Sequence, residues 1–260
     1  MTTPTEPSPT VTVTTTAAIT TIAIDRPAKK NALDGHTYRG LTAALTAAAA
    51  DPAVRCAIIT GSDQVFTAGN DLGDFARVRA GGGDLAAADF LRAIVGFPKP
   101  LVAAVSGWAV GIGTTLLLHC DFVYAAPTAK FRTPFVDLGV CPEGGSSLLL
   151  ARMVGPRRAH ELLYLGRTID GTTAAAWGLV SEAIDQPLAR AQAIAAELAA
   201  KAPAAVRTTK ALLARATAAE LAATMTAELA AFGERLQSDE ATEAAMALMM
   251  RRPADFSRFV

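Results

Sequence analysis

LVAAVSGWAVGIGTTLLLHCDFVYA, residues 101–125, is the stretch that decides the fold class of this chain. It opens with the apolar run 101–105, which is typical of a strand, and closes with a second strand-like run at 121–125. Between them, Gly111-Ile112-Gly113 introduces residues 114–120, whose composition predicts a short buried helix. Strand, helix and strand in this order predict βα units around a mainly parallel α/β sheet.

The flanking segments extend this pattern in both directions. Before it, the sequence predicts a strand hairpin at 11–25, a helix at 36–50 and a buried strand at 55–60. After Gly155 it predicts helices at 156–165 and 172–177, a strand-like run at 178–184, and helices from Pro187 onward with a break at Pro203. We therefore expect a disordered tail at 1–10, an α/β core at 11–200 and a C-terminal helical subdomain at 201–260.

Composition restricts the class of protein. At 260 residues, 51% of them hydrophobic, the chain can bury one large core, and no apolar run reaches the roughly 18 residues that a membrane span needs. Its 24 basic and 24 acidic residues balance and form no basic stripe, so neither nucleic acid nor a membrane surface is an expected partner. Three scattered cysteines predict neither disulfides nor a zinc site. Without the apolar core of a signal peptide at its start, the chain is expected to be cytoplasmic.

Residues 131–147, FRTPFVDLGVCPEGGSS, present one carboxylate, Glu143, among apolar residues and glycines. Desolvation in such a setting raises a carboxyl pKa toward neutrality, which suits a general base, although composition alone also fits an ordinary turn carboxylate. Structural or solvent-facing roles are expected for the other acids between 101 and 150, Asp121 and Asp137, and His119 is expected to be a core histidine. One base moves a proton, whereas two carboxylates are the usual arrangement for adding water.

Two glycine-bearing turns, TAGND at 67–71 and GIG at 111–113, each follow a predicted strand. Ligands bind at the carboxyl ends of strands in α/β sheets, and backbone N–H groups from two such turns, aimed at one point, would form an oxyanion hole. Taken singly, each turn also fits an ordinary strand–helix connection. The second turn does not match the dinucleotide-binding pattern, because Leu116 occupies the position of the third glycine.

Three longer motifs, TAGNDL (67–72), VSGWAVGIGTTLLLHCDFVYA (105–125) and FRTPFVDLGVCPEGGSS (131–147), together resemble the crotonase (enoyl-CoA hydratase/isomerase) superfamily. RPAKKNAL at 26–33 and LYLGRTIDGTTAAAWGLVSEAI at 163–184 add to the resemblance, so that most of the chain between residues 22 and 184 follows the order of the family. AGNDL and CPEGGSS further resemble the peroxisomal-type delta-3, delta-2-enoyl-CoA isomerase branch.

The resemblance implies repeated ββα units with a C-terminal helical trimerisation region, a homotrimer or dimer of trimers, an acyl-CoA thioester of fatty acid metabolism as substrate, and no separate cofactor or metal. By position it assigns the oxyanion N–H groups to Asn70 and Ile112 and the base to Glu143. It places the substrate against Ala68, Asp71, Leu72, Gly111, Trp108, Phe131 and Phe135. Arg26, Lys29 and Lys30 are then either neighbours of the CoA phosphates and adenine or a solvated basic turn.

The sequence departs from the hydratases of this superfamily at two positions. Their two glutamates would fall at Thr115 and Phe135, whereas Glu143 stands where the isomerase branch carries its base. We therefore expect an enzyme that converts 3-enoyl-CoA to 2-trans-enoyl-CoA. The alternatives are a 2-trans-enoyl-CoA hydratase, nucleophilic attack of Glu143 on an aryl-CoA, as a related dehalogenase branch has its aspartate at about this position, and a non-catalytic acyl-CoA-binding protein.

Overall fold

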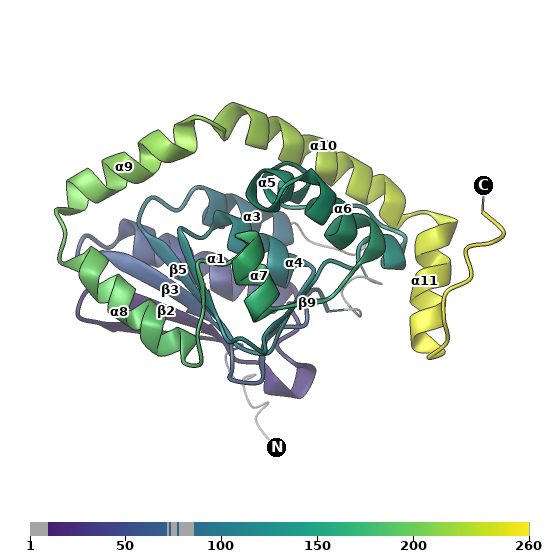
Figure 1. Cartoon of the computed structure of the whole chain (residues 1–260), viewed down its shortest axis with the longest axis horizontal. Coiled ribbons are helices and arrows are strands. Elements are labelled where there is room, and N and C mark those ends of the chain that lie inside the picture. The colour runs from purple at the N-terminus through teal and green to yellow at the C-terminus, as the bar shows by residue number, and fades with distance from the viewer. Residues whose placement is uncertain (1–9, 72, 74–76, 78–85, 260) are drawn as a thin grey trace, which may run out of the picture.

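The computed structural model describes residues 10–71, 73, 77 and 86–259, which form two sheets surrounded by helices (Figure 1). Except for Thr10, the disordered tail expected at 1–10 lies outside these residues. The substrate contact assigned to Leu72 lies outside them as well.

The larger sheet contains six strands in the order β1-β2-β3-β5-β7-β10. They are β1 (Val11–Thr16), β2 (Ile19–Ile24), β3 (Cys56–Thr60), β5 (Leu101–Val105), β7 (Phe122–Ala125) and β10 (Glu182–Ala183). β1 and β2 form the predicted antiparallel hairpin, and the other neighbouring pairs are parallel. The mainly parallel α/β architecture expected from the sequence is confirmed.

Successive side chains of the central strands point to opposite faces of the sheet, and each face has its own apolar layer. Ile58 of β3 and Val102 of β5 pack toward helix α8 (Pro187–Ala199) on one face of the sheet. Ile59 and Ala103, the next residue of each strand, belong to the main core on the other face. Because both faces are covered, β3 and β5 consist of continuous apolar runs rather than alternating ones.

A second sheet of four strands, in the order β4-β6-β8-β9, was not predicted from the sequence. Its members are β4 (Val65–Thr67), β6 (Trp108–Val110), β8 (Lys130–Arg132) and β9 (Ile169–Asp170). β4, β6 and β8 are parallel, and β9 joins the edge of β8 antiparallel. Strands of two or three residues are too short to display an alternating pattern, so only their pairing in space identifies them.

Helices cover the sheets and then extend into a C-terminal arch (Figure 1). Those that precede α8 are α1 (Gly35–Ala50), α3 (Ala86–Val95), α4 (Ile112–Thr115), α5 (Ser146–Val154), α6 (Pro156–Leu165) and α7 (Gly171–Trp177). The arch consists of α9 (Pro203–Arg215) and α10 (Ala218–Leu236), which run over the body of the molecule from α8 to α11 (Asp239–Met249). α10 packs against α5, and this contact brings a late part of the chain to the centre of the fold.

Two predicted elements need correction. The buried helix expected at 114–120 is α4 followed by the 3-10 helix Leu116–His119. The strand-like run at 178–184 contains only the two residues of β10, because Gly178 ends α7 in a left-handed conformation and the chain bends before it reaches the sheet. Pro203 does interrupt the C-terminal helices, as the first residue of α9.

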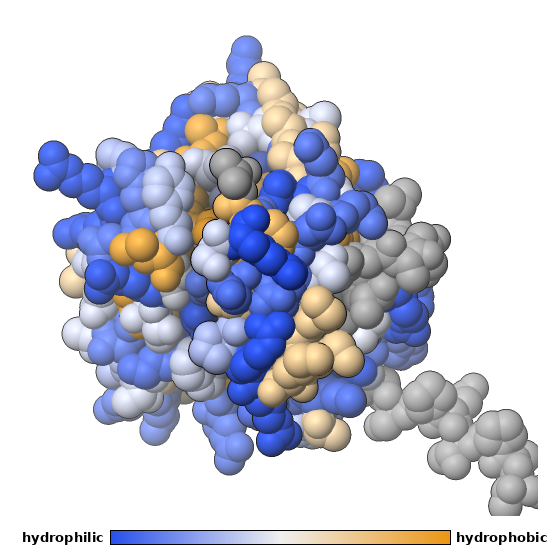
Figure 2. Space-filling view, turned by 90° about the vertical axis from the view of Figure 1, so that its right-hand side faces the viewer, coloured by the Kyte–Doolittle hydropathy of each residue, from blue (hydrophilic) through white to orange (hydrophobic). Residues whose placement is uncertain are grey.

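The face that carries α11 is mostly hydrophilic, with apolar side chains in separate patches (Figure 2). Buried Glu243 of α11 accepts hydrogen bonds from the Arg252 guanidinium and from the Asp255 N–H group, so the residues after α11 are tied back to it. Of the described helices, none combines the length and apolarity required to cross a bilayer.

Candidate active site

Two backbone turns meet at one edge of the smaller sheet. β4 leads into residues 68–70 and β6 into residues 111–112, and the two strands are parallel neighbours. Their carboxyl ends therefore lie at the same edge, which is where ligands bind in α/β sheets. The turns approach closely, since a Cβ atom at Gly69 would lie 2.7 Å from the carbonyl oxygen of Val110. The short strands β4 and β6, rather than the predicted strands at 55–60 and 101–105, lead directly into these turns.

The backbone N–H groups of Asn70 and Ile112 are available to a ligand. Neither donates a hydrogen bond within the described part of the chain, and both residues line the same cavity. Gly111 turns the chain into α4 with φ 57° and ψ −119°, angles that favour glycine strongly. Ile112 is the first residue of α4, where N–H groups have no partner inside the helix. Two such donors at one cavity are the components of an oxyanion hole.

Glu143 lies on a tight turn that precedes α5. Gly144 and Gly145 both have positive φ, 66° and 77°, and the Ser146 N–H group donates to the carbonyl oxygen of Glu143 at 3.1 Å. His119 supports the turn, because its Nε2–H group donates to the carbonyl oxygen of Gly144 at 2.7 Å. Burial lowers the pKa of His119 to about 4, so the ring is neutral, as a histidine with satisfied hydrogen bonds should be.

The carboxyl group of Glu143 has the environment of a general base. Thr115 donates a hydrogen bond from its hydroxyl to Oε1 of Glu143 at 2.5 Å. Loss of solvation raises the pKa of Glu143 to about 7; the Thr115 hydrogen bond opposes this rise, and the charge of Glu228 adds to it. A carboxyl group with this pKa can accept and return a proton near neutral pH.

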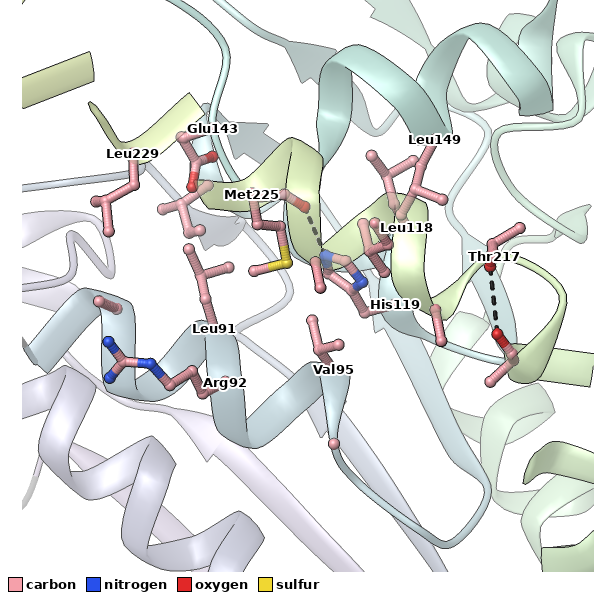
Figure 3. A pocket seen from close by; sticks show the side chains of 18 of the residues that line it. Leu91, Arg92, Val95, Leu118, His119, Glu143, Leu149, Thr217, Met225 and Leu229 are labelled. Carbon is pink, nitrogen blue, oxygen red and sulfur yellow. Dashed lines mark hydrogen bonds between the residues drawn. The ribbon is translucent and has the colours of Figure 1, made fainter. Parts of the chain in front are cut away.

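A cavity of about 710 Å³ separates these groups from the C-terminal arch. Besides Asn70, Ile112 and Glu143, its lining includes Leu91 and Val95 of α3, Leu149 of α5, and Leu221, Met225 and Leu229 of α10. In Figure 3 the labelled lining residues extend from Glu143 past His119 toward Thr217 at the other side of the view. A mostly apolar cavity that also presents a carboxyl group and two backbone N–H groups suits a ligand that has a polar reactive group and an apolar chain.

The aromatic side chains expected as walls of this cavity lie elsewhere. Phe131 and Phe135 are buried in the main core, and Trp108 is 45% exposed on β6. None of the three belongs to the described lining. The apolar walls come largely from α3 and α10, two helices that lie outside the motifs at 67–72, 105–125 and 131–147.

Arg26 and Asp71, two residues that the family resemblance places near the substrate, bind each other. Nη1 of Arg26 lies 2.6 Å from Oδ2 of Asp71, and Nη2 lies 2.8 Å from Oδ2 of Asp34. Nη1 also donates to the carbonyl oxygen of Ala32. These bonds join the loop at 26–34 to the turn after β4, so both Nη atoms of Arg26 already have partners within the chain.

Lys29 and Lys30 are exposed on that same loop. The carbonyl oxygen of Lys30 accepts a hydrogen bond from the Ala68 N–H group at 3.1 Å, which places the two lysines beside the Asn70 turn. Ala68 and Gly111, also expected to bind substrate, lie in the two turns themselves and outside the described cavity lining. The two lysines are therefore the charged groups that stay accessible near the cavity on this loop.

Tyr38 of α1 is a site residue that the sequence did not reveal. Its hydroxyl donates a hydrogen bond to Oδ1 of Asn70, and its side chain is buried on the wall of the cavity. Burial, with a contribution from the charge of Glu143, raises the pKa of Tyr38 well above its usual value, so the hydroxyl keeps its proton. Helical spacing marks Tyr38 as a buried position but gives no sign that it reaches a site.

Helix α10 supplies a second feature that the sequence did not reveal. Buried Glu228 accepts hydrogen bonds from the N–H groups of Gly145 at 2.6 Å and Ser147 at 2.9 Å, directly after Glu143. Residues 221, 225 and 229 of α10 are apolar at a spacing of four, which signals one packed face of a helix. That spacing does not indicate which surface the face covers.

The other two acids near Glu143 in sequence have structural partners, as expected. Asp121 accepts from the Leu101 N–H group at 2.7 Å and pairs with Nζ of Lys210 at 2.7 Å. Asp137 forms a surface ion pair with Arg132 at 2.8 Å. Across the described residues, no group of three or more His, Cys, Asp or Glu side chains is placed to hold a metal ion.

A parallel α/β core whose adjacent turns present N–H groups at a cavity that also holds the Glu143 carboxyl group defines a class of proteins with an oxyanion-type site. The chain belongs to the enoyl-CoA hydratase/isomerase family, whose family model matches residues 14–258. This confirms the resemblance seen in the sequence motifs.

Individual relatives differ in their named activities. Human enoyl-CoA delta isomerase 2 is 36% identical over 252 residues, 94% of this chain, although the chain spans only 64% of that protein. The crotonyl-CoA hydratase of Syntrophomonas wolfei is 35% identical over 243 residues, covering 90% of the chain and 92% of the relative. The solved structure of Pseudomonas aeruginosa OdaA matches with a TM-score of 0.89 and 43% identity, over 93% of this chain and 99% of that one. Similarity therefore shows the family and leaves isomerase and hydratase activities unresolved.

Proposed function

We propose that this protein converts 3-enoyl-CoA to 2-trans-enoyl-CoA, with Glu143 as a single proton shuttle. The observation that carries the proposal is the placement of the Glu143 carboxyl, with its raised pKa, on the same cavity as the Asn70 and Ile112 N–H groups. A base and an oxyanion hole at one cavity are sufficient for proton transfer next to a thioester carbonyl.

The reaction follows from these groups. The two N–H groups bind the thioester oxygen and stabilise the negative charge that develops there when a C2 proton leaves. Glu143 accepts that proton, and the electrons shift so that the double bond moves from C3–C4 to C2–C3. Glu143 then returns the same proton at C4. The hydrogen bond from Thr115 holds the carboxyl group in place during both transfers.

The environment of the other carboxylates favours isomerisation over hydration. Asp121 also lines the cavity, but it is paired with Lys210. The carboxyl group of Glu228 accepts hydrogen bonds from the backbone N–H groups of Gly145 and Ser147. Among the described residues that line the cavity, Asp121 is thus paired with a cation and Glu143 is not. One carboxylate can move a proton without adding water.

The remaining substrate contacts follow from the shape of the cavity. The apolar side chains of α3 and α10 hold the acyl chain, and Lys29 and Lys30 attract the phosphates of coenzyme A at the outer side of the Asn70 turn. Coenzyme A enters as part of the substrate, so the proposed reaction uses no separate cofactor.

Hydration of 2-trans-enoyl-CoA is the second candidate, because relatives named as hydratases match the chain at 35% identity. For hydration, Glu143 would have to activate water without either of the two hydratase glutamates, whose positions are occupied by Thr115 and Phe135. Thr115 donates a hydrogen bond to Glu143 and has no acidic proton to give.

The test is a parallel assay of the purified protein with 3-trans-hexenoyl-CoA and 2-trans-hexenoyl-CoA. Wild type is compared with Glu143→Gln and with Asp137→Asn, a matched control that removes a nearby acid already paired with Arg132 on the surface. We expect conjugation of the 3-enoyl substrate by wild type and Asp137→Asn, and a loss of about 10²- to 10⁴-fold in Glu143→Gln.

Each other outcome contradicts the proposal in a different way. Hydration of the 2-enoyl substrate without isomerisation would assign the protein to the hydratases. An aryl ester trapped on Glu143 after single turnover with an aryl-CoA would indicate nucleophilic chemistry. Tight acyl-CoA binding by calorimetry without turnover of either substrate would indicate a binding protein.

A further inference from the structure

Glu228 is a buried acid that the proposed reaction does not use. It lies on α10, 7% exposed, and it is absent from the described cavity lining. Its carboxyl group accepts three hydrogen bonds: from Gly145 N–H at 2.6 Å, Ser147 N–H at 2.9 Å and Ser147 Oγ at 2.5 Å. A buried carboxylate is costly unless it is paired or well hydrogen-bonded, so its position here calls for a role.

The three donors belong to the residues that immediately follow Glu143. The segment 143–147 contains Gly144 and Gly145, both at positive φ, and such a turn has little stiffness of its own. Glu228 fixes the turn at its far end, while His119 fixes it at the carbonyl oxygen of Gly144. The direction in which the Glu143 side chain leaves the backbone therefore depends on an anchor that comes from another helix.

The same helix also forms part of the cavity wall. Met225 and Leu229 of α10, which flank Glu228, both line the cavity that Glu143 faces (Figure 3). One helix thus contacts both the space assigned to the acyl chain and the turn that carries the base. A small displacement of α10 would move the carboxyl group of Glu143 relative to the substrate, and proton transfer is sensitive to such displacements.

We propose that Glu228 is a positioning residue that anchors the Glu143–Ser147 turn to α10 and so sets the place of the base relative to the acyl group. This rests on the proposed role of Glu143 as the base. Glu228 touches no reacting atom; it acts through the backbone of Gly145 and Ser147.

The charge of Glu228 also affects the pKa of Glu143, and a purely structural contact would have no such effect. The groups that act on Glu143 are Thr115 by hydrogen bond and Glu228 by its charge, while Tyr38 and Cys141 respond to the charge of Glu143. Neutral His119 contributes no charge. Since the negative charge of Glu228 raises the pKa of Glu143, removing it should allow Glu143 to ionise at a lower pH.

The experiment compares Glu228→Gln with Glu220→Gln in the full-length protein. Glu220 is a matched control, because it is also a glutamate of α10 and binds Arg152 of α5, but at the surface. Steady-state kinetics with 3-trans-hexenoyl-CoA from about pH 5 to pH 9 give kcat and KM, and a carbon-13 NMR titration of the free protein gives the pKa of Glu143 without any turnover. The signal is assigned by its loss in Glu143→Gln.

For Glu228→Gln we expect kcat to fall at least about tenfold with little change in KM, and the midpoint of the Glu143 titration to move to lower pH. Glu220→Gln should change neither. Unchanged kcat and midpoint in Glu228→Gln would overturn the proposal, and so would an equal loss of kcat in both variants.

Two further variants keep the test decisive if Glu228→Gln does not fold. Glu228→Asp retains the charge but shortens the side chain, so kcat should fall while the Glu143 midpoint stays high. Ser147→Ala removes one of the three hydrogen bonds and should lower kcat less. Wild-type kcat in both would overturn the proposal. A shifted Glu143 midpoint in a protein that turns over no enoyl-CoA would leave the anchoring intact and reject the proposed function instead.

Discussion

Glu143 shows how burial turns an ordinary acid into a candidate base. Its pKa rises from 4.5 to about 7 because the carboxyl group loses solvation, and the single hydrogen bond from Thr115 does not compensate for that loss. The position at which the hydratases of the superfamily carry their first glutamate is thus occupied here by a hydroxyl that orients the base.

The raised pKa of Glu143 has a consequence for stability. The folded chain binds this proton more tightly than the unfolded chain does, so ionisation costs stability as pH rises from about 4.5 through about 7. We expect Glu143→Gln, which is uncharged at every pH, to be more stable than wild type at pH 8 by roughly 1–3 kcal/mol. Urea unfolding at pH 8 and pH 5 measures this, and a difference that does not shrink at pH 5 would contradict it.

Tyr38 gives a second prediction at this scale. Its hydroxyl is the donor to Oδ1 of Asn70, so Tyr38→Phe leaves that oxygen without this partner and frees the side chain beside the oxyanion turn. We expect a loss of about 1 kcal/mol in the free energy of unfolding and a fall of about tenfold in kcat/KM. The control is Tyr164→Phe, a tyrosine that is exposed and stacked on His160. Equal effects of the two substitutions would contradict the assignment.

At the scale of elements, short strands and glycine turns position the site more than the long central strands do. β4 and β6 bring the two N–H donors to one edge, and Gly111 starts α4 in the required direction. The close approach of Gly69 to Val110 leaves no room for a side chain between the turns. The geometry of the site is therefore set by backbone, which tolerates a change of side chain at Asn70 or Ile112 better than a change of glycine.

A pair of glycines tests this. A Cβ atom at Gly111 or at Gly155 meets nothing within 4 Å, yet both have positive φ, 57° and 83°. Replacement by alanine should therefore cost both variants about 1–3 kcal/mol of stability through backbone strain alone. Only Gly111→Ala should also lower kcat, by about 10²-fold, because it alone precedes the Ile112 N–H group. Thermal unfolding and steady-state kinetics separate the effects; equal kcat losses would contradict the argument.

At the scale of the whole molecule, the C-terminal arch has two features: it forms one wall of the cavity, and it exposes apolar side chains to solvent. α9 has no buried residue within the chain, and its Leu212 and Leu213 are 62% and 74% exposed. Exposed leucines on an arm of this kind are typical of contacts between subunits. The arch also carries the residues of α10 that line the cavity, so the exposed leucines and part of the site belong to the same region of the chain.

The family resemblance predicts a homotrimer or a dimer of trimers. We expect light scattering after size exclusion to give a mass of three or six times the 26.8 kDa of one chain. Leu212→Glu, which places a charge on the exposed face of α9, should shift the mass toward that of one chain, whereas Met153→Glu, at an exposed methionine of α5, should not. A wild-type mass of one chain would contradict the prediction.

Much of the core could be predicted because its signals are local. The apolar runs of β3 and β5, the helical spacing of α1 and the proline and glycine that bound α6 all lie within a few residues of the elements they specify. Glu143 could be predicted as a candidate base for the same reason, because it is a lone carboxylate among neighbouring apolar residues and glycines. Motif order then identified the family, which the family match confirms.

What the sequence alone determined was thus the α/β class, the family and the lone carboxylate, because each depends on neighbours along the chain. What only the tertiary structure decided was which groups surround that carboxylate. Tyr38, Thr115 and Glu228 come from α1, α4 and α10, and Arg26 forms ion pairs with Asp34 and Asp71. Contacts between distant segments depend on how helices and short strands pack, and no local pattern encodes which surface a given apolar face will cover.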